Sequence, residues 1–477
     1  MQKIEICGIS IENNLFFQEE DMSTNRKSMS RRAFLRTATL AVGAGVAAAC
    51  APSATPSAPT TAPKTTAPPK ATVTIRVGSH WGGTTGDAFQ KMIDNYNTNQ
   101  GAQDKIKAEY VVNGNATATI TASRLAGTPI DTYNIGTETA LTFYASDTII
   151  ALAGEDDAII KNDFFPAWQE MGYYNGKCLG YPSEFNCCAL FYRKSWFKDA
   201  GLNPPKTPED VRAAAKALTK GEGTTKRMGY VFGFDNWHGT AHVFGNVFRF
   251  GGSLWKWEGD TPVDFDIDNP AMKAAVDYFQ EMVKDGSTNV KISSGIDPAW
   301  QNGLAGMTED AGWFPLIVVR DAGKKDIYED MGFVPQPVPS GAKPFSRTYG
   351  RVMAIDSRSQ YKDEAVKMLR YWNASADMPF QKHLVEFIGC VPGNKKYPMD
   401  TIQWSADMKE AWLKQIAPVA MPDKDRKGLS YMEIRTKCEP ILQGIWLGTK
   451  TYDDLKALQK DLKSIFTRLD GPRSMKK

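Results

Sequence analysis

The sequence predicts an α/β fold for the body of the chain, which follows an export segment and a tether. Short β-branched runs alternate along the body with capped amphipathic helices, and this alternation is typical of α/β proteins. Hydrophobic residues make up 42% and charged residues 23% of the 477 residues, as in an ordinary globular protein. The body has about 400 residues, a length that indicates two or three domains.

The first element is an export signal. Residues 30–36 read Ser-Arg-Arg-Ala-Phe-Leu-Arg, as in a twin-arginine signal, and a weakly apolar run over residues 38–49 ends at Cys50. Because a bilayer span takes about 20 apolar residues, this shorter run is interpreted as the hydrophobic part of a signal. The small residues before Cys50 resemble a bacterial lipobox and predict a lipid on this cysteine. Ala47 stands where leucine is usual, so cleavage without lipidation is the alternative.

A tether follows the signal. Residues 51–71 are almost wholly Ala, Pro, Thr, Ser and Lys, a composition that cannot form a core and favours extended polyproline II. At about 3.1 Å per residue it would hold the body roughly 60 Å from a membrane surface. Such a spacer makes sense with an anchor at its start, which favours lipidation at Cys50. The acidic residues near the beginning of the chain predict that translation starts at Met22.

Strands open the body. Residues 73–77 alternate with β-branched side chains and run into a glycine-rich loop over residues 78–83, and a helix is expected from about Asp87. Further strands are predicted at residues 106–112 and 131–135.

The later helices carry clear start signals. Thr207 is a predicted N-cap, followed by proline and two acidic residues that suit the positive end of the helix dipole. Asn269 precedes a second such helix, with Gly286 as its stop. A last helix is expected to carry the apolar stripe from Leu455 to Leu469. Trp372 and Trp412 sit at helical spacing and are predicted to be core side chains.

The charge and hydropathy of the body argue against nucleic-acid binding and against a membrane-spanning protein. The net charge is +3, and the body has no basic patch of the kind that binds nucleic acid. After the export signal, no second apolar run is long enough to span a membrane.

The five cysteines of the body are odd in number, so at least one is free or pairs between chains. An oxidising exterior would permit a bridge from Cys178 to Cys187 or Cys188, and another from Cys390 to Cys438. The sequence leaves this pairing open.

Four segments of the body stand in a specific order. The first segment, residues 124–131, reads Arg-Leu-Ala-Gly-Thr-Pro-Ile-Asp. The second begins at residues 175–182 with Asn-Gly-Lys-Cys-Leu-Gly-Tyr-Pro. It continues over residues 190–210 and ends with Pro-Lys-Thr-Pro-Glu-Asp. Residues 302–314 contain Gly-Leu-Ala-Gly-Met and Gly-Trp, and residues 354–372 complete the series. Together they resemble the extracellular solute-binding proteins of ABC importers, in the sugar-binding family related to maltodextrin-binding protein.

The resemblance implies a two-lobed, class II periplasmic-binding-protein-like fold with a cleft between the lobes and a multi-strand hinge. The chain would cross near residues 182–186, 307–313 and 347–354. The predicted organisation is an export segment over 1–50, a tether over 51–71, lobe one over 72–183 plus 312–346, and lobe two over 186–310 plus 350–477.

Candidate binding residues follow from the chemistry of a sugar. Its hydroxyls take hydrogen-bonding and charged side chains, and its apolar faces take planar aromatic rings, in a concave site between domains. Trp81, between the first strand and two glycines, and Trp313, in the family's Gly-x-Trp position, are predicted stacking platforms; a packed or lid residue is the alternative for Trp81. The other candidates, at loops, strand ends and crossings, are Glu138, Glu184, Asp235, Trp237, Asp310, Tyr349 and Arg351. Their alternatives are a solvated surface or helix cap for the carboxylates and a hinge salt bridge for Arg351.

The predicted function is that of an exported, lipid-anchored solute-binding component of an ABC importer, on the outer face of the cytoplasmic membrane. It would capture a carbohydrate by lobe closure and deliver it to the permease subunits, as a monomer without enzyme activity, cofactor or metal. His238 and His242 have the spacing of two metal ligands, but Gly239 replaces the glutamate that zinc proteases need. The alternatives are a non-sugar solute such as a phosphate ester, polyamine or peptide, a structural or sensory lipoprotein, and a secreted glycosidase with paired carboxylates.

Overall fold

The computed structural model describes residues 71–113, 116–233, 236–288 and 296–471. The chain from Pro69 onward forms one compact unit. The predicted export segment, with Cys50, and the tether up to residue 70 lie outside the described residues.

The described strands form one large mixed sheet and two small hairpins. The order of the large sheet is β10-β6-β11-β3-β1-β2, with β12 pairing β11 and β9 pairing β6. The strands are β1 Val73–Ser79, β2 Ile106–Val112, β3 Thr132–Gly136, β4 Tyr173–Tyr174, β5 Lys177–Cys178, β6 Tyr181–Arg193, β7 Trp255–Glu258, β8 Thr261–Phe265, β9 Met307–Ala311, β10 Met331–Pro335, β11 Ser346–Ile355 and β12 Ala420–Pro422.

Helices cover this sheet. They are α2 Gly83–Thr98, α3 Gln100–Asp104, α4 Ala116–Leu125, α5 Thr137–Ala145, α6 Glu155–Asp163, α7 Pro166–Gly172, α8 Lys194–Asp199, α9 Pro208–Leu218, α10 Asn236–Arg249, α11 Pro270–Lys284, α12 Ile296–Gln301, α13 Lys325–Asp330, α14 Lys362–Ala374, α15 Pro379–His383, α16 Ala406–Lys409, α17 Tyr431–Trp446, α18 Tyr452–Lys456 and α19 Gln459–Leu469. Shorter or wider turns are η1 Gly223–Thr225, η2 Phe314–Arg320, η3 Leu384–Ile388, η4 Met399–Thr401, η5 Glu410–Ile416, η6 Ala417–Val419 and η7 Lys424–Lys427.

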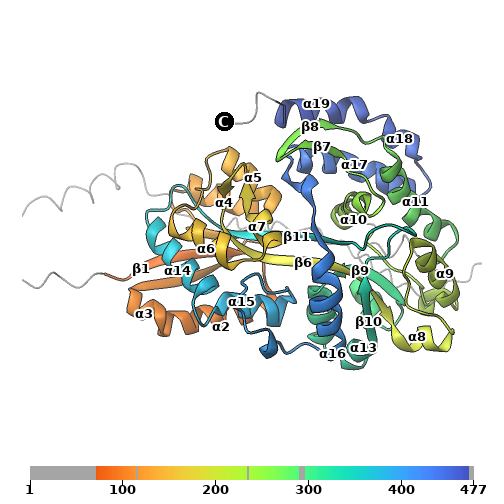
Figure 1. The fold of residues 1–477 in the computed structure, drawn as a ribbon, viewed down its shortest axis with the longest axis horizontal. Coiled ribbons are helices and arrows are strands. Elements are labelled where there is room, and N and C mark those ends of the chain that lie inside the picture. The colour runs from red at the N-terminus through yellow and green to blue at the C-terminus, as the bar shows by residue number, and fades with distance from the viewer. Residues whose placement is uncertain (1–70, 114–115, 234–235, 289–295, 472–477) are drawn as a thin grey trace, which may run out of the picture. The chain divides into compact units, whose positions relative to one another are not determined.

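Two long strands, β6 and β11, run through the middle of the molecule (Figure 1). The first half of β6 pairs with β11, with Asn186 opposite Tyr349, whereas its second half pairs with β9 and β10. The far end of β11 pairs with β3, so both strands serve two lobes. This is the α/β, two-lobed arrangement that the sequence predicts.

The first lobe is built on the parallel strands β1, β2 and β3. In Figure 1, α4 and α5 lie above these strands and α2 and α3 below them. One large core runs along the sheet and contains both tryptophans predicted to be core side chains, Trp372 and Trp412, each fully buried. The second lobe has its own core among α9, α10, α11, α17 and α19.

The predicted helix starts are confirmed at two places. Thr207 accepts the backbone N–H of Asp210, whose side chain accepts in return, and Asn269 accepts from Met272 at the start of α11. The predicted strands over 73–77 and 106–112 are confirmed as β1 and β2. The expected last helix is interrupted, however, since α18 ends at Lys456 and α19 begins at Gln459.

The structure divides the lobes differently from the prediction. Met307–Ala311 pairs with the same half of β6 as β10 does, so the chain does not cross there and residues 331–335 lie in the second lobe. The crossing at β11 then returns the chain to the first lobe, where α14 packs against β1 and α6. Helices α17 and α19 belong to the second-lobe core, so the chain crosses again between α14 and α17.

Candidate ligand site between the two lobes

The candidate site lies where β6 and β11 pass from one lobe to the other. A bulge interrupts their pairing between Gly350 and Val352, so that Ser183 and Glu184 of β6 lie opposite the single residue Arg351. A bulge bends a strand and redirects its side chains. Gly350 is required here because a Cβ atom would lie 2.4 Å from the Glu184 carbonyl oxygen and 2.3 Å from Met171 Sδ.

Glu184 is the centre of a polar cluster. Its carboxylate, with a side chain only 6% exposed, lies 3.4 Å from Arg351 Nε and 4.0 Å from His80 Nε2. The Asn134 amide donates to Glu184 Oε1 at 2.8 Å, and the Asn186 amide lies 3.4 Å from Oε2. A buried carboxylate is tolerated only when it is paired and hydrogen-bonded in this way.

His80 contributes a neutral imidazole to this cluster. Burial lowers the pKa of His80 to about 4, against an opposing effect of Glu184 and with a smaller lowering effect of Arg351. The ring is therefore uncharged near neutral pH and presents one donor and one acceptor nitrogen. Its Nδ1 atom has no hydrogen-bond partner among the described residues.

An aromatic pair lies beside the cluster. Trp313 Nε1 donates a hydrogen bond to Tyr349 Oη at 2.9 Å, and both side chains are half-buried. Burial, together with the negative charge of Asp310, raises the pKa of Tyr349 well above its usual value, so the phenol stays neutral. The pair combines apolar ring surface with a hydroxyl group.

A buried arginine from the C-terminal part of the chain closes the other side. Arg426, on η7, lies with Nη1 3.4 Å from Glu138 Oε2 and with Nε 3.3 Å from Asp423 Oδ2. Its guanidinium lies 5.1 Å from the centre of the Tyr349 ring. Glu138, at the start of α5 in the first lobe, is thereby tied to the segment that leads into the second lobe.

Arg426 is not among the site residues predicted from the sequence. The run Asp-Lys-Asp-Arg-Lys over residues 423–427 has the composition of a solvated loop, yet Asp423, Asp425 and Arg426 are buried. The burial results from the pairing of β12 with β11, which nothing in the local sequence indicates.

The comparison with known families fits this geometry. The bacterial extracellular solute-binding protein family matches residues 82–378, more than half of the chain. The chain belongs to this family.

Relatives of this solute-binding protein are distant in sequence. A binding protein of Brucella abortus (strain 2308) is 23% identical over 290 residues, which are 58% of this chain and 66% of the relative, just under two thirds of its length. Among solved structures, maltose-bound MalE3 of T. maritima has a TM-score of 0.68 at 19% identity and covers 82% of this chain and 99% of that chain. An ABC transporter solute-binding protein of Thermotoga lettingae TMO, bound with α-D-tagatose, has a TM-score of 0.66 at 20% identity, over 83% and 100% of the two chains. These likenesses show the two-lobed fold.

The structure brings most of the predicted site residues of this solute-binding protein together. Glu184 and Arg351 pair directly, as do Trp313 and Tyr349, and Glu138 joins them through Arg426. Asp310, buried on β9, accepts the backbone N–H of Ala311. Asp235 lies outside the described residues. Trp237 is in the first turn of α10, but its side chain also lies outside the described part of the chain.

Trp81 occupies a packed position, the alternative raised for it from the sequence. It is 5% exposed, and its ring lies edge-on to Phe89 at 5.0 Å and to His383 at 4.9 Å between centroids. Its neighbour His80 reaches the site, whereas the indole of Trp81 fills the core beneath it. We therefore leave Trp81 out of the proposed ligand contacts.

The five body cysteines are free thiols in the structure, and all are buried. Cys390 lies beside the hinge strand, with Sγ 3.7 Å from Asn186 Oδ1, and Cys188 lies 3.6 Å from Arg347 Nη2. Neither of the disulfides permitted by the sequence analysis is formed.

Two further features concern the described part of the chain. Among those residues, no helix has the length and apolar character that a membrane crossing takes. Within the same ranges, no group of three His, Cys, Asp or Glu side chains is placed to hold a metal ion. The side chain of His238 lies outside the described residues, so the spacing of His238 and His242 stays untested.

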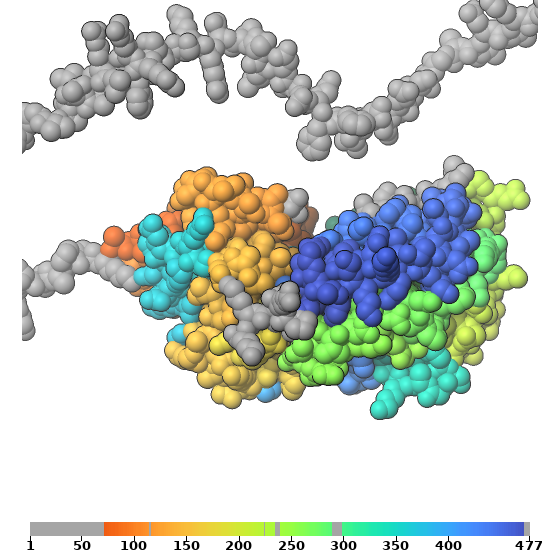
Figure 2. Space-filling model, turned by 90° about the horizontal axis from the view of Figure 1, so that it is seen from above, coloured from red at the N-terminus to blue at the C-terminus, as the bar shows by residue number. Residues whose placement is uncertain are grey.

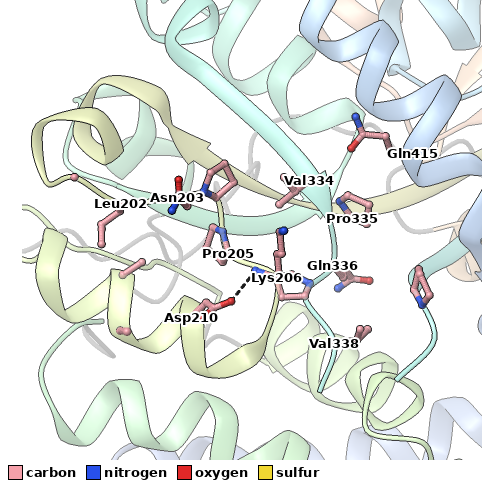
Figure 3. A pocket seen from close by; sticks show the side chains of 16 residues that line it. Leu202, Asn203, Pro205, Lys206, Asp210, Val334, Pro335, Gln336, Val338 and Gln415 are labelled. Atoms are coloured by element: carbon pink, nitrogen blue, oxygen red, sulfur yellow. Dashed lines mark hydrogen bonds between the residues drawn. The ribbon is translucent and has the colours of Figure 1, made fainter. Parts of the chain in front are cut away.

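A separate cavity of about 900 Å³ opens on the second lobe. It lies between the loop after α8, strand β10 and the segment that follows it, and Figure 3 shows Pro205, Lys206, Val334 and Pro335 around it. Among the described residues that line it, none belongs to the strands β1–β3 or the helices α2–α7 of the first lobe. A solute bound there would not be enclosed by closure of the lobes, so we place the ligand site at the crossing strands.

Distant parts of the chain adjoin on one face of the molecule. Figure 2 shows the C-terminal helices in blue adjoining the orange and yellow segments of the first lobe.

Proposed function

We propose that this chain is the extracellular solute-binding component of an ABC importer, and that it captures a neutral carbohydrate at the Glu184–Tyr349 site for delivery to a permease. The observation that carries the proposal is the half-buried Trp313–Tyr349 pair next to the Glu184 cluster, because Tyr349 and Glu184 lie on strands shared by both lobes. A solute at this place touches both lobes, which is what ligand-driven closure requires.

The chemistry of the site suits hydroxyl groups and apolar ring faces. Asn186, His80 and Arg351 offer donors and acceptors around Glu184, and charge-assisted hydrogen bonds are the strong ones in such sites. Trp313 offers a ring that can stack on a sugar face. The relatives of known structure are described as bound to maltose, α-D-tagatose and ribitol, which supports a carbohydrate or polyol.

The pairing of charges favours a neutral solute over a charged one. Arg351, which is partly exposed, is already paired with Glu184, and Arg426 with Glu138. A phosphate ester would have to compete for these cations, and a polyamine for these carboxylates. The low pKa of about 4 leaves His80 without a positive charge that would attract an anion.

A solute panel tests the proposal. Purified body protein is titrated with neutral sugars, polyols, phosphate esters, polyamines and peptides, followed by tryptophan fluorescence and calorimetry. We expect saturable binding of one class of neutral carbohydrate, which is recovered unchanged, and markedly weaker binding by Trp313→Ala. Trp257→Phe is the matched control, because Trp257 is also half-buried but lies on the second-lobe hairpin. A response to charged solutes or peptides alone would overturn the choice of ligand while keeping the family.

The glycosidase alternative has weaker support. Glu309 and Asp310 are consecutive on a strand and point to opposite faces, and Glu309 is held in a buried ion pair with Arg249. Glu138 and Glu184 are each paired with an arginine. Hydrolysis of the bound carbohydrate in the calorimeter cell would favour an enzyme.

We also propose that the protein is held on the outer face of the membrane by a lipid on Cys50. The twin-arginine segment, the lipobox-like residues and the proline-rich tether support this, and a lipid with two or more chains gives stable anchoring. Cys50→Ser should move the protein from the membrane fraction to the soluble fraction of the producing cells. An unchanged distribution would argue against the anchor.

A further inference from the structure

Two glycines from distant parts of the sequence pack backbone against backbone. Gly312 directly precedes Trp313, and Gly389 follows η3 and precedes Cys390. A Cβ atom on Gly389 would lie 2.2 Å from the Gly312 carbonyl oxygen and 3.1 Å from the Trp313 backbone nitrogen. A Cβ atom on Gly312 would lie 2.2 Å from the Gly389 carbonyl oxygen.

This contact lies where the chain leaves the sheet, just before Trp313. β9 ends at Ala311, Gly312 follows, and η2 begins at Phe314. The Trp313 backbone is thus held at the junction by Gly389, while its indole donates to Tyr349 at 2.9 Å. The flanking residues fix the same segment, because His383 packs on Trp81 and Cys390 lies 3.7 Å from Asn186 Oδ1.

We propose that Gly389 is a positioning residue of the ligand site, which acts by holding Trp313 against Tyr349. This inference rests on the proposed function only in so far as Trp313 contacts the solute. A site of this kind needs its side chains held within about 0.5 Å of the productive geometry. A Cβ atom at residue 389, 2.2 Å from the Gly312 carbonyl oxygen, forces a larger displacement of the peptide group that joins Gly312 to Trp313.

The left-handed backbone of Gly389 is a separate reason for glycine, so it needs a control. Gly389 has φ +71 at the end of η3, a common role for glycine after a helix. Gly323 follows η2 with φ +76, and a Cβ atom there would meet nothing within 4 Å. Gly323→Ala therefore introduces the same kind of backbone strain without the close approach.

The first measurement needs no ligand. The emission of Trp313 is obtained for each protein as the difference between its spectrum and that of the same protein carrying Trp313→Phe. We expect Gly389→Ala to shift this difference spectrum to longer wavelength and to increase its quenching by acrylamide, and Gly323→Ala to change neither. An unchanged Trp313 spectrum in folded Gly389→Ala would overturn the proposal.

The second measurement uses the carbohydrate identified in the solute panel. Gly389→Ala should weaken its binding by about tenfold or more, since a 1 Å misplacement can cost about 100-fold. In a Trp313→Ala background the same substitution should weaken binding by less than about twofold. Equal losses in both backgrounds would mean that Gly389 does not act through Trp313.

The two measurements separate the proposals. If no solute binds the parent protein, the proposed function fails, while the emission of Trp313 still decides whether Gly389 positions it. If Gly389→Ala does not fold, Ile388→Val keeps both glycines and loosens the buried end of η3. Acrylamide quenching of Trp313 should then rise, and unchanged quenching would overturn the positioning role.

Discussion

The buried cation of Arg426 gives a prediction that needs no ligand. Arg426→Met keeps the length of the side chain and removes its charge. Arg426 lies 3.4 Å from Glu138 and 3.3 Å from Asp423, and all three side chains are less than one tenth exposed. Removing one partner of a buried ion pair costs about 3–5 kcal/mol because it leaves an uncompensated charge. Since two carboxylates share this cation, we expect the free energy of unfolding to fall by at least about 3 kcal/mol.

Urea denaturation at pH 7, followed by circular dichroism, measures this change, and Arg468→Met is the matched control. Arg468 pairs with Glu433 at 2.6 Å, but the two side chains are 56% and 44% exposed, so its loss should cost about 0–1 kcal/mol. Burial raises the pKa of Asp423 above its usual value, so its charge is lost at a higher pH than that of a free aspartate, and the effect of Arg426→Met should shrink as the pH falls. Equal losses in the two variants at pH 7 would refute the reasoning.

Three further outcomes are expected. Trp313→Ala should weaken carbohydrate binding by about 2–3 kcal/mol, which calorimetry measures as a roughly 30- to 150-fold increase in Kd. Trp313→Phe loses only the hydrogen bond to Tyr349 and should weaken binding by about 1 kcal/mol. A change in Kd below about twofold in Trp313→Ala would remove this residue from the site. Burial raises the pKa of Asp425 to about 7, above the value of about 3.9 in an unfolded chain. Its contribution to stability is therefore present below about pH 4 and lost as the pH rises to 7, so Asp425→Asn should be less destabilised than the parent by that rise, and parallel pH profiles in urea would contradict this. Burial raises the pKa of the Cys178 and Cys188 thiols to about 11, and all five cysteines of the body are buried. The folded body should therefore react negligibly with Ellman's reagent, whereas five thiols should react in the unfolded body. A count of three or fewer reactive thiols in the unfolded body would indicate a disulfide.

Local sequence predicted those elements whose signals are local. Thr207 and Asn269 cap their helices because side chain, proline and apolar stripe all lie within one turn. Several residues of the candidate site were named from the sequence through the family resemblance. Glu184, Trp313 and Tyr349 lie in or beside the segments that this resemblance placed at the crossings.

The rest depends on contacts between distant segments. The lobe boundaries were predicted from crossings, but the direction of a crossing is set by strand pairing, and β9 pairs with the same half of β6 as β10. Arg426 was missed because its burial comes from β12 joining β11. Trp81 was predicted to be a stacking platform, but its ring packs in the core against Phe89 and against His383, which is distant in the sequence.

The return of the chain to the first lobe has a consequence for how the protein is made. Arg124 and Asp356 form an ion pair 232 residues apart along the sequence, and Trp372 completes the core around Phe89. A nascent chain that has emerged only as far as β6 lacks β11 and α14, so it exposes the apolar faces these elements cover. Contacts of such long range slow folding and leave intermediates prone to aggregation. Assembly of the half of the protein that is synthesised first must therefore wait until most of the other half has been made.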